Sequence, residues 1–432
     1  MSSPYKTVAL HTFGCKANFA DTSLLNSTFV KKGYSIVPFE NIADIYVINT
    51  CSVTDNANKK CRKLIKNLKG RAPESIIGVT GCYAQLKPEE IIEIPEVNFV
   101  VGMHDKYNYI DKIESISSDQ KLLFHSNDIQ SIENAFLAYS LNERTRSFIK
   151  IQDGCDYSCS YCTIPKARGK SRSVKIKEII EHIHQLEDNN VNEIILSGIN
   201  VGDFGIDNDE SLLSLLKQIN KHSNIPRIRI SSIEPNLLTD DIINFIASNQ
   251  NFMPHLHIPL QSGSDYILKK MKRRYTVKSY SDRILTVKEK IKDCTIGVDV
   301  MVGFPGETEK YFNETYDLLN DLPVSYFHVF PFSERENTLA ASMNKTIDLD
   351  VRYARAKILR KLSKIKFQKM HEDNVDVIRP VLFEMIDEGL MSGLTDNYIR
   401  VQTKVSSKAK VNQIANVKLL SSNSGIMTGL TL

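Results

Sequence analysis

The sequence predicts an α/β protein in three parts: an N-terminal open, mostly parallel α/β sheet, a central partial (β/α)6 barrel and a small C-terminal β-barrel. Three observations predict this fold class. Apolar runs alternate with helix-like stretches near the N-terminus, a second alternation starts near residue 145, and the C-terminal end carries short β-like pieces without a clear helix. The expected parts are an N-terminal domain at 4–118, a linker at 119–140, a central domain at 141–370 and a C-terminal domain at 371–432.

The N-terminal sheet is predicted from short apolar runs, which lie at 7–13, 34–39, 43–50, 75–81 and 98–102. Cys15, Cys51 and Cys82 each fall just after one of these runs. Ligand sites gather at the carboxyl ends of the strands in parallel α/β sheets. We therefore expect these three cysteines, which are far apart in sequence, to meet at one edge of the sheet.

The central barrel is predicted from six strand-like runs, at 147–151, 192–197, 227–231, 255–260, 296–302 and 326–330. Helical patterns follow them near 175–188, 210–221, 239–248, 264–292, 307–321 and 350–371. Six β/α units suit an incomplete, open version of the parallel barrel. Active sites on such barrels lie at the carboxyl ends of the strands.

The two remaining segments differ from these alternating regions. Residues 114–140 are rich in Ser, Asn, Gln and Asp, which is typical of a connection between domains. Near the C-terminus, pieces such as VLFEMI, YIRVQTK and AKVNQI are separated by Gly and Asn turns. These pieces predict a small β-barrel.

Composition narrows the functional class. The chain has 432 residues, of which 42% are hydrophobic and 25% charged, as in a globular enzyme, and its net charge of +4 excludes a polycation. We expect a cytoplasmic protein with no membrane partner, because neither a secretory signal nor a run of about 20 apolar residues is evident. In such a chain, clustered cysteines favour metal binding or catalysis over disulfides.

The central region carries a C-x3-C-x2-C motif, formed by Cys155, Cys159 and Cys162 after the first barrel strand. Three thiolates on one loop can hold three irons of a cubane cluster and leave the fourth iron open. A structural zinc site would normally need four protein ligands, and no second cysteine pair or histidine lies nearby in the sequence. A zinc site and a chemically inert cysteine cluster are the alternatives.

This motif after the first strand of a partial barrel resembles the radical S-adenosylmethionine (SAM) superfamily. The resemblance implies a 4Fe-4S cluster whose open iron binds SAM, and reduction of the sulfonium to a 5′-deoxyadenosyl radical. It also implies SAM contacts from Tyr161, before the third cysteine, and from polar residues at other strand ends. Each of these residues taken alone is nearly as well explained by hydrogen bonding at the barrel mouth. The expected cofactor-binding residues are Tyr161, Gly198, Asn200, Ser231, Glu234, Gln261 and Asp299.

The N-terminal cysteines lie in FGCKAN (13–18), NTCSVT (49–54) and TGCYAQ (80–85), which resemble the cluster-binding segments of the methylthiotransferases. This resemblance implies an auxiliary 4Fe-4S cluster on Cys15, Cys51 and Cys82, a C-terminal TRAM barrel and the use of two SAM molecules. All six ligand cysteines would then be catalytic. The alternative for the N-terminal trio is a set of buried, reduced cysteines. Cys61 and Cys294 match no ligand position, and we interpret them as packing residues.

Members of this family modify either a tRNA adenosine or an aspartate of a ribosomal protein, and basic runs favour RNA. Lys and Arg are dense at 59–71, 166–177, 269–292 and 352–369. Such runs can neutralise phosphates along a strand. A solvated helix face is the better explanation of any single run, and it is the four separate runs in a chain of low net charge that favour an RNA surface.

Within the tRNA branch, GCKAN, HVFPFSER (328–335) and LTDNYIRV (394–401) resemble the enzymes that act on N6-threonylcarbamoyladenosine. The resemblance implies methylthiolation of C2 at position 37 of tRNA, with the anticodon stem-loop as partner and Arg335 or Arg400 as the binder of the threonyl carboxylate. We also expect a cellular one-electron reductant and a monomer. The alternatives are the isopentenyl adenosine, the ribosomal aspartate and, from another class, an RNA-binding iron-sulfur redox sensor.

Overall fold

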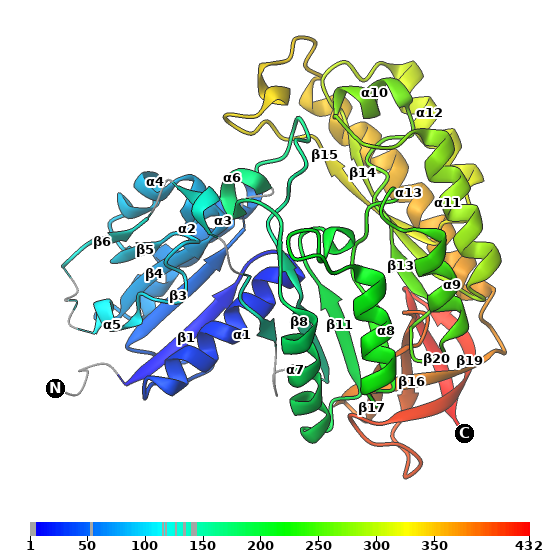
Figure 1. Ribbon diagram of the computed structural model, residues 1–432, viewed down its shortest axis with the longest axis horizontal. Helices are drawn as coiled ribbons and strands as arrows, with labels where there is room; N and C mark the ends of the chain where they lie inside the picture. The colour runs from blue at the N-terminus through cyan, green and yellow to red at the C-terminus, as the bar shows by residue number, and fades with distance from the viewer. Residues whose placement is uncertain are drawn as a thin grey trace. The chain divides into compact units, whose positions relative to one another are not determined.

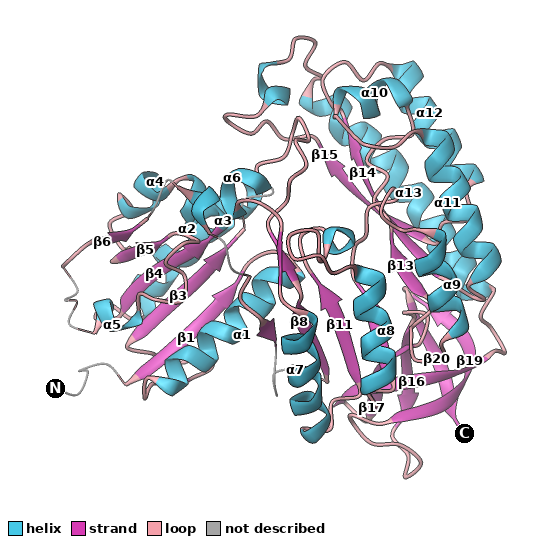
Figure 2. Cartoon of the chain, in the orientation of Figure 1, coloured by secondary structure: helices cyan, strands magenta, loops and turns pink. Residues whose placement is uncertain are grey.

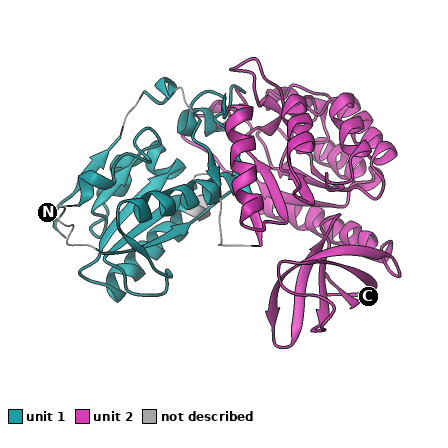
Figure 3. Ribbon diagram, turned by 60° about the horizontal axis from the view of Figure 1, so that its bottom comes forward, with its two compact units in different colours: residues 1–140, 148–157, 162–174 teal, residues 141–147, 158–161, 175–432 magenta. Residues whose placement is uncertain are grey.

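The chain forms two compact units in the computed structural model (Figure 3). Unit 1 comprises residues 1–140, 148–157 and 162–174, and unit 2 comprises residues 141–147, 158–161 and 175–432. The residues that the structure describes are 6–51, 55–114, 116, 119–125, 128–132, 135–139 and 145–432. Among these residues, no helix combines the length and the hydropathy that crossing a bilayer requires.

Unit 1 is built on a six-stranded sheet with the strand order β2-β1-β3-β4-β5-β6. All five pairings between neighbouring strands are parallel, which confirms the predicted open parallel α/β sheet. The strands are β1 (Thr7–Thr12), β2 (Ser35–Ile36), β3 (Ile45–Thr50), β4 (Ile76–Gly81), β5 (Phe99–Val101) and β6 (Leu122–Phe124). Strand β6 lies inside the segment predicted as a linker.

Helices cover both faces of this sheet because its central strands are apolar on both sides. Ile45 and Val47 pack with residues of α1 (Lys16–Lys31) and α5 (Ile110–Ile113). Tyr46 and Ile48 face the other way and pack with residues of the helices that follow β3 and β4. Those helices are α2 (Asp55–Arg71), α3 (Cys82–Leu86) and α4 (Pro88–Ile92).

The rest of unit 1 is short. Helix α6 (Ile164–Arg168) packs against α3, and β7 (Ala138–Tyr139) pairs antiparallel with the end of β8 (Arg146–Lys150). The other elements are η1 (Ile129–Ser131) and the antiparallel pair of β9 (Gln152–Asp153) and β10 (Arg172–Ser173).

Unit 2 continues the strand–helix alternation that starts with β8 (Figure 1), as the sequence predicts for the partial barrel. Strand β11 pairs in parallel with β12, and β14 pairs in parallel with both β13 and β15. The strands are β11 (Glu193–Ser197), β12 (Arg227–Ile230), β13 (His255–His257), β14 (Thr295–Val302) and β15 (Tyr326–Pro331). The helices are α7 (Ile176–Asp188), η2 (Val201–Asp203), α8 (Leu212–His222), α9 (Asp240–Ser248), α10 (Asp265–Lys270), α11 (Val277–Lys290), α12 (Glu309–Asp321), η3 (Leu339–Ser342) and α13 (Leu349–Glu372).

One helix differs from the prediction. The segment 264–292 was expected to be a single helix, but it forms α10 and α11 with a turn between them. Lys272 has a φ of 57°, which ends the first helix. Thr276 then caps the second helix, because its side chain accepts from the Ser279 amide and the Ser279 hydroxyl accepts from the Thr276 amide.

The C-terminal strands close into a five-stranded barrel with the order β16-β17-β18-β20-β19 (Figure 2), which confirms the predicted small β-barrel. Its interior contains Phe383, Val401 and Met427, all fully buried. Within unit 2, Arg227 of β12 donates to the carbonyls of Leu394 and Pro380 in this barrel. The strands are β16 (Ile378–Asp387), β17 (Leu390–Thr395), β18 (Arg400–Lys404), β19 (Ile414–Asn423) and β20 (Ile426–Thr431).

Candidate functional site

Cys15, Cys51 and Cys82 follow the carboxyl ends of three adjacent strands of unit 1. In the sheet register, Thr12 of β1 lies opposite Asn49 of β3, and Thr50 of β3 lies opposite Gly81 of β4. Cys15 is the N-cap of α1, and Cys82 is the first residue of α3. The topology therefore brings the three cysteine segments to one edge of the sheet.

Two glycines allow these segments to touch. Gly14 precedes Cys15 and has a φ of 116°, and a Cβ on it would come within 2.6 Å of the Cys51 Cβ and 3.1 Å of the Cys51 Sγ. Gly81 precedes Cys82 and has a φ of 96°, and a Cβ on it would come within 2.4 Å of the Thr50 carbonyl oxygen. Because neither glycine has a side chain, the backbone before Cys15 can lie against Cys51, and the backbone before Cys82 can lie against Thr50.

Side-chain hydrogen bonds hold the same three segments together. Asn18 donates from Nδ2 to the carbonyls of Phe13, at 2.8 Å, and Thr50, at 3.0 Å. Asn49 donates from Nδ2 to the Asn18 carbonyl at 2.9 Å, and the Thr50 hydroxyl donates to the Thr80 carbonyl. These bonds are buried or partly buried, so they fix the strand ends that carry the cysteines.

The eight cysteines, all within the described residues, form no disulfide. Cys15 is exposed, whereas Cys51 and Cys82 are buried. Cys61 and Cys294 are also buried, and burial raises the pKa of each thiol to about 12. A thiol with that pKa stays protonated near neutral pH, which agrees with the interpretation of these two as packing residues.

Arg168, at the end of α6, reaches the N-terminal cysteines. Its guanidinium donates a hydrogen bond to the Cys82 thiol and also interacts electrostatically with Cys15. Its Nε–H is buried and finds no hydrogen-bond partner within the described ranges. Burial raises the pKa of the Cys82 thiol, and the positive charge of Arg168 opposes that rise. A buried donor beside thiols suits a site that holds an anionic sulfur ligand set.

The Arg168 guanidinium is itself held by carboxylates. It donates to Asp153 Oδ1 at 2.7 Å and to Asp21 Oδ2 at 3.1 Å. Lys106 donates to Asp21 Oδ2 at 2.8 Å, and Lys150 bonds both carboxylates. Burial alone would raise the pKa of Asp21, but Lys106, Lys150 and Arg168 together hold it well below its ordinary value. The sequence reasoning missed this network, since Asp21 and Arg168 are 147 positions apart.

The C-x3-C-x2-C loop is divided between the two units: Cys155 and Cys162 belong to unit 1, and Cys159 belongs to unit 2. In unit 1, the Cys155 amide donates to the Gly169 carbonyl at 3.1 Å. The Tyr157 amide points at Cys155 Sγ at 3.4 Å, and the Ile164 amide points at Cys162 Sγ at 3.5 Å. Backbone donors of this kind favour the thiolate form that a metal centre needs.

In unit 2, Cys159 has an arginine partner of its own. Arg273 Nη1 donates to Cys159 Sγ at 3.1 Å and lies 3.5 Å from the Tyr161 hydroxyl. Glu234 forms an ion pair with the same guanidinium. Burial alone would lower the pKa of Arg273, but Tyr161, Tyr275, Glu234 and Cys159 raise it, so this arginine stays charged. Sequence reasoning did not select Arg273, which lay within a basic run with no feature that set it apart.

Most of the residues predicted to bind SAM follow strands of unit 2, whereas Tyr161 lies in the cysteine loop and Asp299 lies inside β14. Ser231, directly after β12, is 4% exposed, and its hydroxyl has no hydrogen-bond partner in the described part of the chain. Asn200 donates to Asp203 at 2.6 Å, and Gly198 follows β11. Gln261 has a φ of 65°, a strained conformation that is held by backbone hydrogen bonds to Asp299 and Met301. The Asp299 carboxylate lies 3.0 Å from His257 Nε2.

The two predicted carboxylate binders have different surroundings. Arg335 is 9% exposed and lies in the segment after β15. Arg400 lies on β18 of the small barrel, where its Nη1 is 3.4 Å from the Glu384 carboxylate.

Comparison with known proteins agrees with the motifs in both halves of the chain. Residues 7–102 match a family model described as the uncharacterized protein family UPF0004, and residues 149–319 match the radical SAM superfamily. Among solved structures, a radical SAM methyltransferase, TsrM from Kitasatospora setae, has a TM-score of 0.60 at 12% identity, covering 91% of this chain and 82% of that chain. This likeness supports the fold.

Full-length relatives are also found. The threonylcarbamoyladenosine tRNA methylthiotransferase MtaB of Bacillus subtilis is 38% identical, covering 96% of this chain and 94% of its own length. The enzyme of the same name from Aquifex aeolicus is 36% identical, covering 91% and 96%. A tRNA-2-methylthio-N(6)-dimethylallyladenosine synthase of Clostridium tetani is 32% identical, covering 96% and 93%. The chain belongs to the radical SAM methylthiotransferase family.

Proposed function

We propose that this chain is a tRNA methylthiotransferase that converts N6-threonylcarbamoyladenosine at position 37 of tRNA to its 2-methylthio form, using two molecules of SAM. The observation that carries the proposal is the similarity over nearly the whole chain to relatives named for this substrate, at 38% and 36% identity. Relatives named for the dimethylallyl adenosine are 32–33% identical. That substrate is the second candidate.

The proposed ligands of the radical-generating 4Fe-4S cluster are Cys155, Cys159 and Cys162, and those of the auxiliary 4Fe-4S cluster are Cys15, Cys51 and Cys82. The donor chemistry suits this assignment, because each set offers three thiols and each has an arginine that donates to one of its sulfurs. When bound, the clusters and SAM supply one-electron reduction, a carbon radical and a methylated sulfur.

The chain's own residues support these groups. Arg168 orients Cys82 and balances thiolate charge at the N-terminal site, and Arg273 does the same for Cys159. The buried Ser231 hydroxyl lacks a partner among the described residues, so it suits a ligand that offers a hydrogen-bonding group. The proposed SAM contacts are Tyr161, Gly198, Asn200, Ser231, Glu234, Gln261 and Asp299. The Asp299 carboxylate also pairs with His257.

The proposed partners are the tRNA anticodon stem-loop and a cellular one-electron reductant, and the proposed state is a cytoplasmic monomer. Helix α2 supports an RNA surface, since most of its basic side chains are exposed while Cys61, Ile65 and Leu68 are buried. Exposed cations on one helix face can neutralise phosphates. By contrast, Arg168 and Arg172 of the run 166–177 are buried in unit 1 and cannot contact RNA from there.

The test is an anaerobic assay of the reconstituted full-length protein with SAM and a reductant. Three substrates are offered: an anticodon stem-loop with threonylcarbamoyladenosine, one with dimethylallyladenosine, and a ribosomal protein. The expected result is methylthio incorporation into the first, accompanied by 5′-deoxyadenosine. Incorporation only into the second stem-loop or only into protein would replace the proposed substrate. Iron without any cleavage of SAM would favour a redox sensor.

A further inference from the structure

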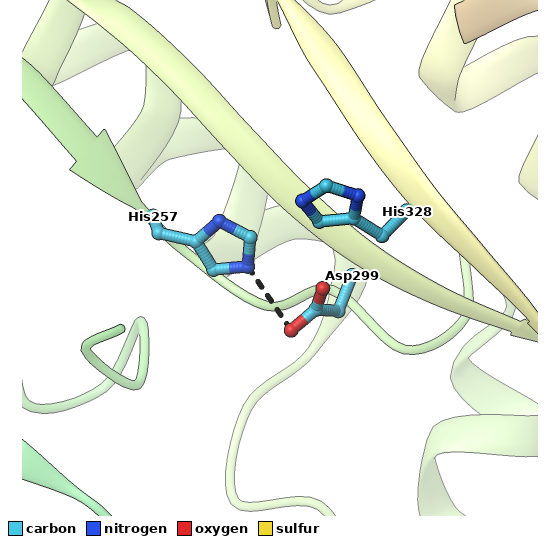
Figure 4. Close-up of side chains that lie close together, drawn as sticks. All are labelled: His257, Asp299 and His328. Carbon is cyan, nitrogen blue, oxygen red and sulfur yellow. Dashed lines mark ion pairs between the residues drawn. The ribbon is translucent and has the colours of Figure 1, made fainter. Parts of the chain in front are cut away.

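Three polar side chains meet on neighbouring strands of unit 2: His257 on β13, Asp299 on β14 and His328 on β15 (Figure 4). Asp299 lies directly opposite His328 in the register, and His257 lies opposite Gly297, two residues away on the same strand. One donor or acceptor atom from each side chain lies within 4.8 Å of the others. We call this set the His–Asp–His cluster.

The cluster occupies the accessible face of this three-stranded sheet. Val298 and Val300, which flank Asp299, point to the opposite face and are fully buried. The side chains of His257 and Asp299 keep 14% and 27% of their surface exposed, and His328 is exposed. Burying these polar groups under a bound molecule would cost free energy unless that molecule formed hydrogen bonds to them.

The layer below the cluster is closed. His255 is 3% exposed, its Nε2 lies 2.9 Å from the Tyr326 hydroxyl, and its ring stacks on Tyr398 with centroids 4.3 Å apart. A Cβ on Gly297 would come within 2.6 Å of the Tyr326 hydroxyl and 2.8 Å of His257 Nδ1, so only glycine fits between them. Protein side chains therefore fill the positions next to the His–Asp–His cluster on this side.

The cluster also lies next to the proposed SAM segment. Met301 is two residues beyond Asp299 on the same face, which is about 7 Å along a strand. Met301 and Tyr161 both pack against the apolar cluster that contains Phe304. Gln261 donates from its amide to the Asp299 carbonyl and accepts from the Met301 amide. A group held by the cluster would thus be close to the proposed cofactor contacts.

We propose that the His–Asp–His cluster is the subsite that binds the polar N6 substituent of the substrate adenosine, an inference that rests on the proposed function. Imidazole N–H groups can donate to the threonyl carboxylate, and the Asp299 carboxylate can accept from a hydroxyl or ureido N–H. A dimethylallyl group offers no hydrogen-bonding atom and would cover these polar side chains without forming a hydrogen bond to them. The cluster therefore selects for a carboxylate-bearing substituent.

The test compares the reconstituted wild-type protein with the variants His328→Gln and His257→Gln. His222→Gln is the matched control, because His222 is an exposed histidine at the end of α8 in the same unit. KM and kcat are measured with stem-loops carrying threonylcarbamoyl- or dimethylallyladenosine. Iron content, zinc content and RNA-independent formation of 5′-deoxyadenosine are measured as well.

Each cluster variant is expected to raise KM for the threonylcarbamoyl stem-loop about tenfold, because one charge-assisted hydrogen bond is lost. Its preference for the threonylcarbamoyl stem-loop over the dimethylallyl stem-loop should fall. Iron content and RNA-independent SAM cleavage should match the control. Three results would overturn the inference. They are a KM of the cluster variants equal to that of His222→Gln, a loss of RNA-independent SAM cleavage in the cluster variants, and one bound zinc in the wild type that the cluster variants lack. If wild type leaves the threonylcarbamoyl stem-loop unmodified, the proposed function itself fails.

Discussion

Each cysteine site has an arginine that donates to a thiol, but the two arginines have different surroundings. Arg168 in unit 1 is fully buried and shares two carboxylates with two buried lysines. Arg273 in unit 2 has one carboxylate partner, Glu234, whose side chain is 15% exposed. The first arginine belongs to a charge network that must form when the unit folds. The second is also buried, at 4% exposed, but it belongs to a smaller set of contacts, with Cys159 and Glu234.

The difference implies that Arg168 contributes mainly to the folding stability of unit 1, whereas Arg273 contributes mainly to the properties of a bound cluster. Removing one member of a buried charge network leaves its partners without compensation, which is far more costly than the loss of the net interaction. Removing a donor whose carboxylate partner keeps access to solvent should mainly change the electrostatics of the sulfur that it contacted. Unit 1 should therefore respond to substitution by unfolding, and unit 2 by a change in cluster properties.

The largest effect is expected for Arg168→Met. This change leaves Asp21 and Asp153 short of a buried cation, so unit 1 should lose about 3–5 kcal/mol of unfolding free energy in urea titrations. The control is Arg62→Met on α2, where both partners of the Arg62–Glu90 ion pair are more than one-third exposed. That control should lose only about 0–1 kcal/mol. Equal losses would contradict the structural role of the network.

Gly14→Ala should damage the N-terminal cysteine site, because the new Cβ would collide with Cys51. We expect about half of the iron to be lost after reconstitution. Gly33→Ala is the matched control, since Gly33 also has a positive φ, of 88°, but nothing lies within 4 Å of its Cβ position. The control also places an alanine at a positive φ, and it should keep its iron. Full iron in Gly14→Ala would show that Cys51 need not lie beside Gly14.

Arg273→Gln should keep the iron of both clusters and make the reduction potential of the radical-generating cluster more negative. A lost charge-assisted hydrogen bond of about 1.5–3 kcal/mol corresponds to at most about 60–130 mV for a one-electron couple. Potentiometric titration followed by electron paramagnetic resonance measures the shift. Arg283→Gln, which removes an ion pair to Asp240 in the same unit, should leave the potential unchanged. A shift in the control as large as that in Arg273→Gln would mean that total charge, not the contact to Cys159, sets the potential.

The smallest effect concerns the two remaining cysteines. Because burial raises the pKa of Cys61 and Cys294 to about 12, very little thiolate exists at pH 8. Iodoacetamide should therefore label the exposed Cys15 of the native apoprotein but leave Cys61 and Cys294 unlabelled until the chain unfolds. Mass spectrometry of the labelled peptides measures this, and rapid native labelling of Cys294 would contradict its interpretation as a packing residue.

The sequence was sufficient to predict that the segments carrying Cys15, Cys51 and Cys82 lie at one edge of the sheet, because strand ends share an edge in a parallel sheet. It was not sufficient for their support. Asp21 and Arg168 are joined only by folding, and no local pattern marks them as partners. The basic runs were misleading for a related reason: Arg352 in the run 352–369 is 3% exposed and paired with Glu334.

Local signals at helix boundaries were also incomplete. The break between α10 and α11 depends on Thr276 and Ser279, whose reciprocal capping resembles a capping box without the usual Glu or Gln.

The His–Asp–His cluster was missed because its members are separated by more than 25 residues along the chain and come together only through the register of three parallel strands. Of these three residues, only Asp299 was predicted to be functional.

Two separate sets of three thiols are proposed to hold two clusters. Anaerobic quantification of iron and sulfide checks this on the triple variants Cys15→Ala/Cys51→Ala/Cys82→Ala and Cys155→Ala/Cys159→Ala/Cys162→Ala. The double variant Cys61→Ala/Cys294→Ala serves as the control. Each triple variant should keep about half of the wild-type iron with its circular dichroism spectrum unchanged, and the control should keep all of it. Full iron in either folded triple variant would show that its three substituted cysteines do not hold a cluster.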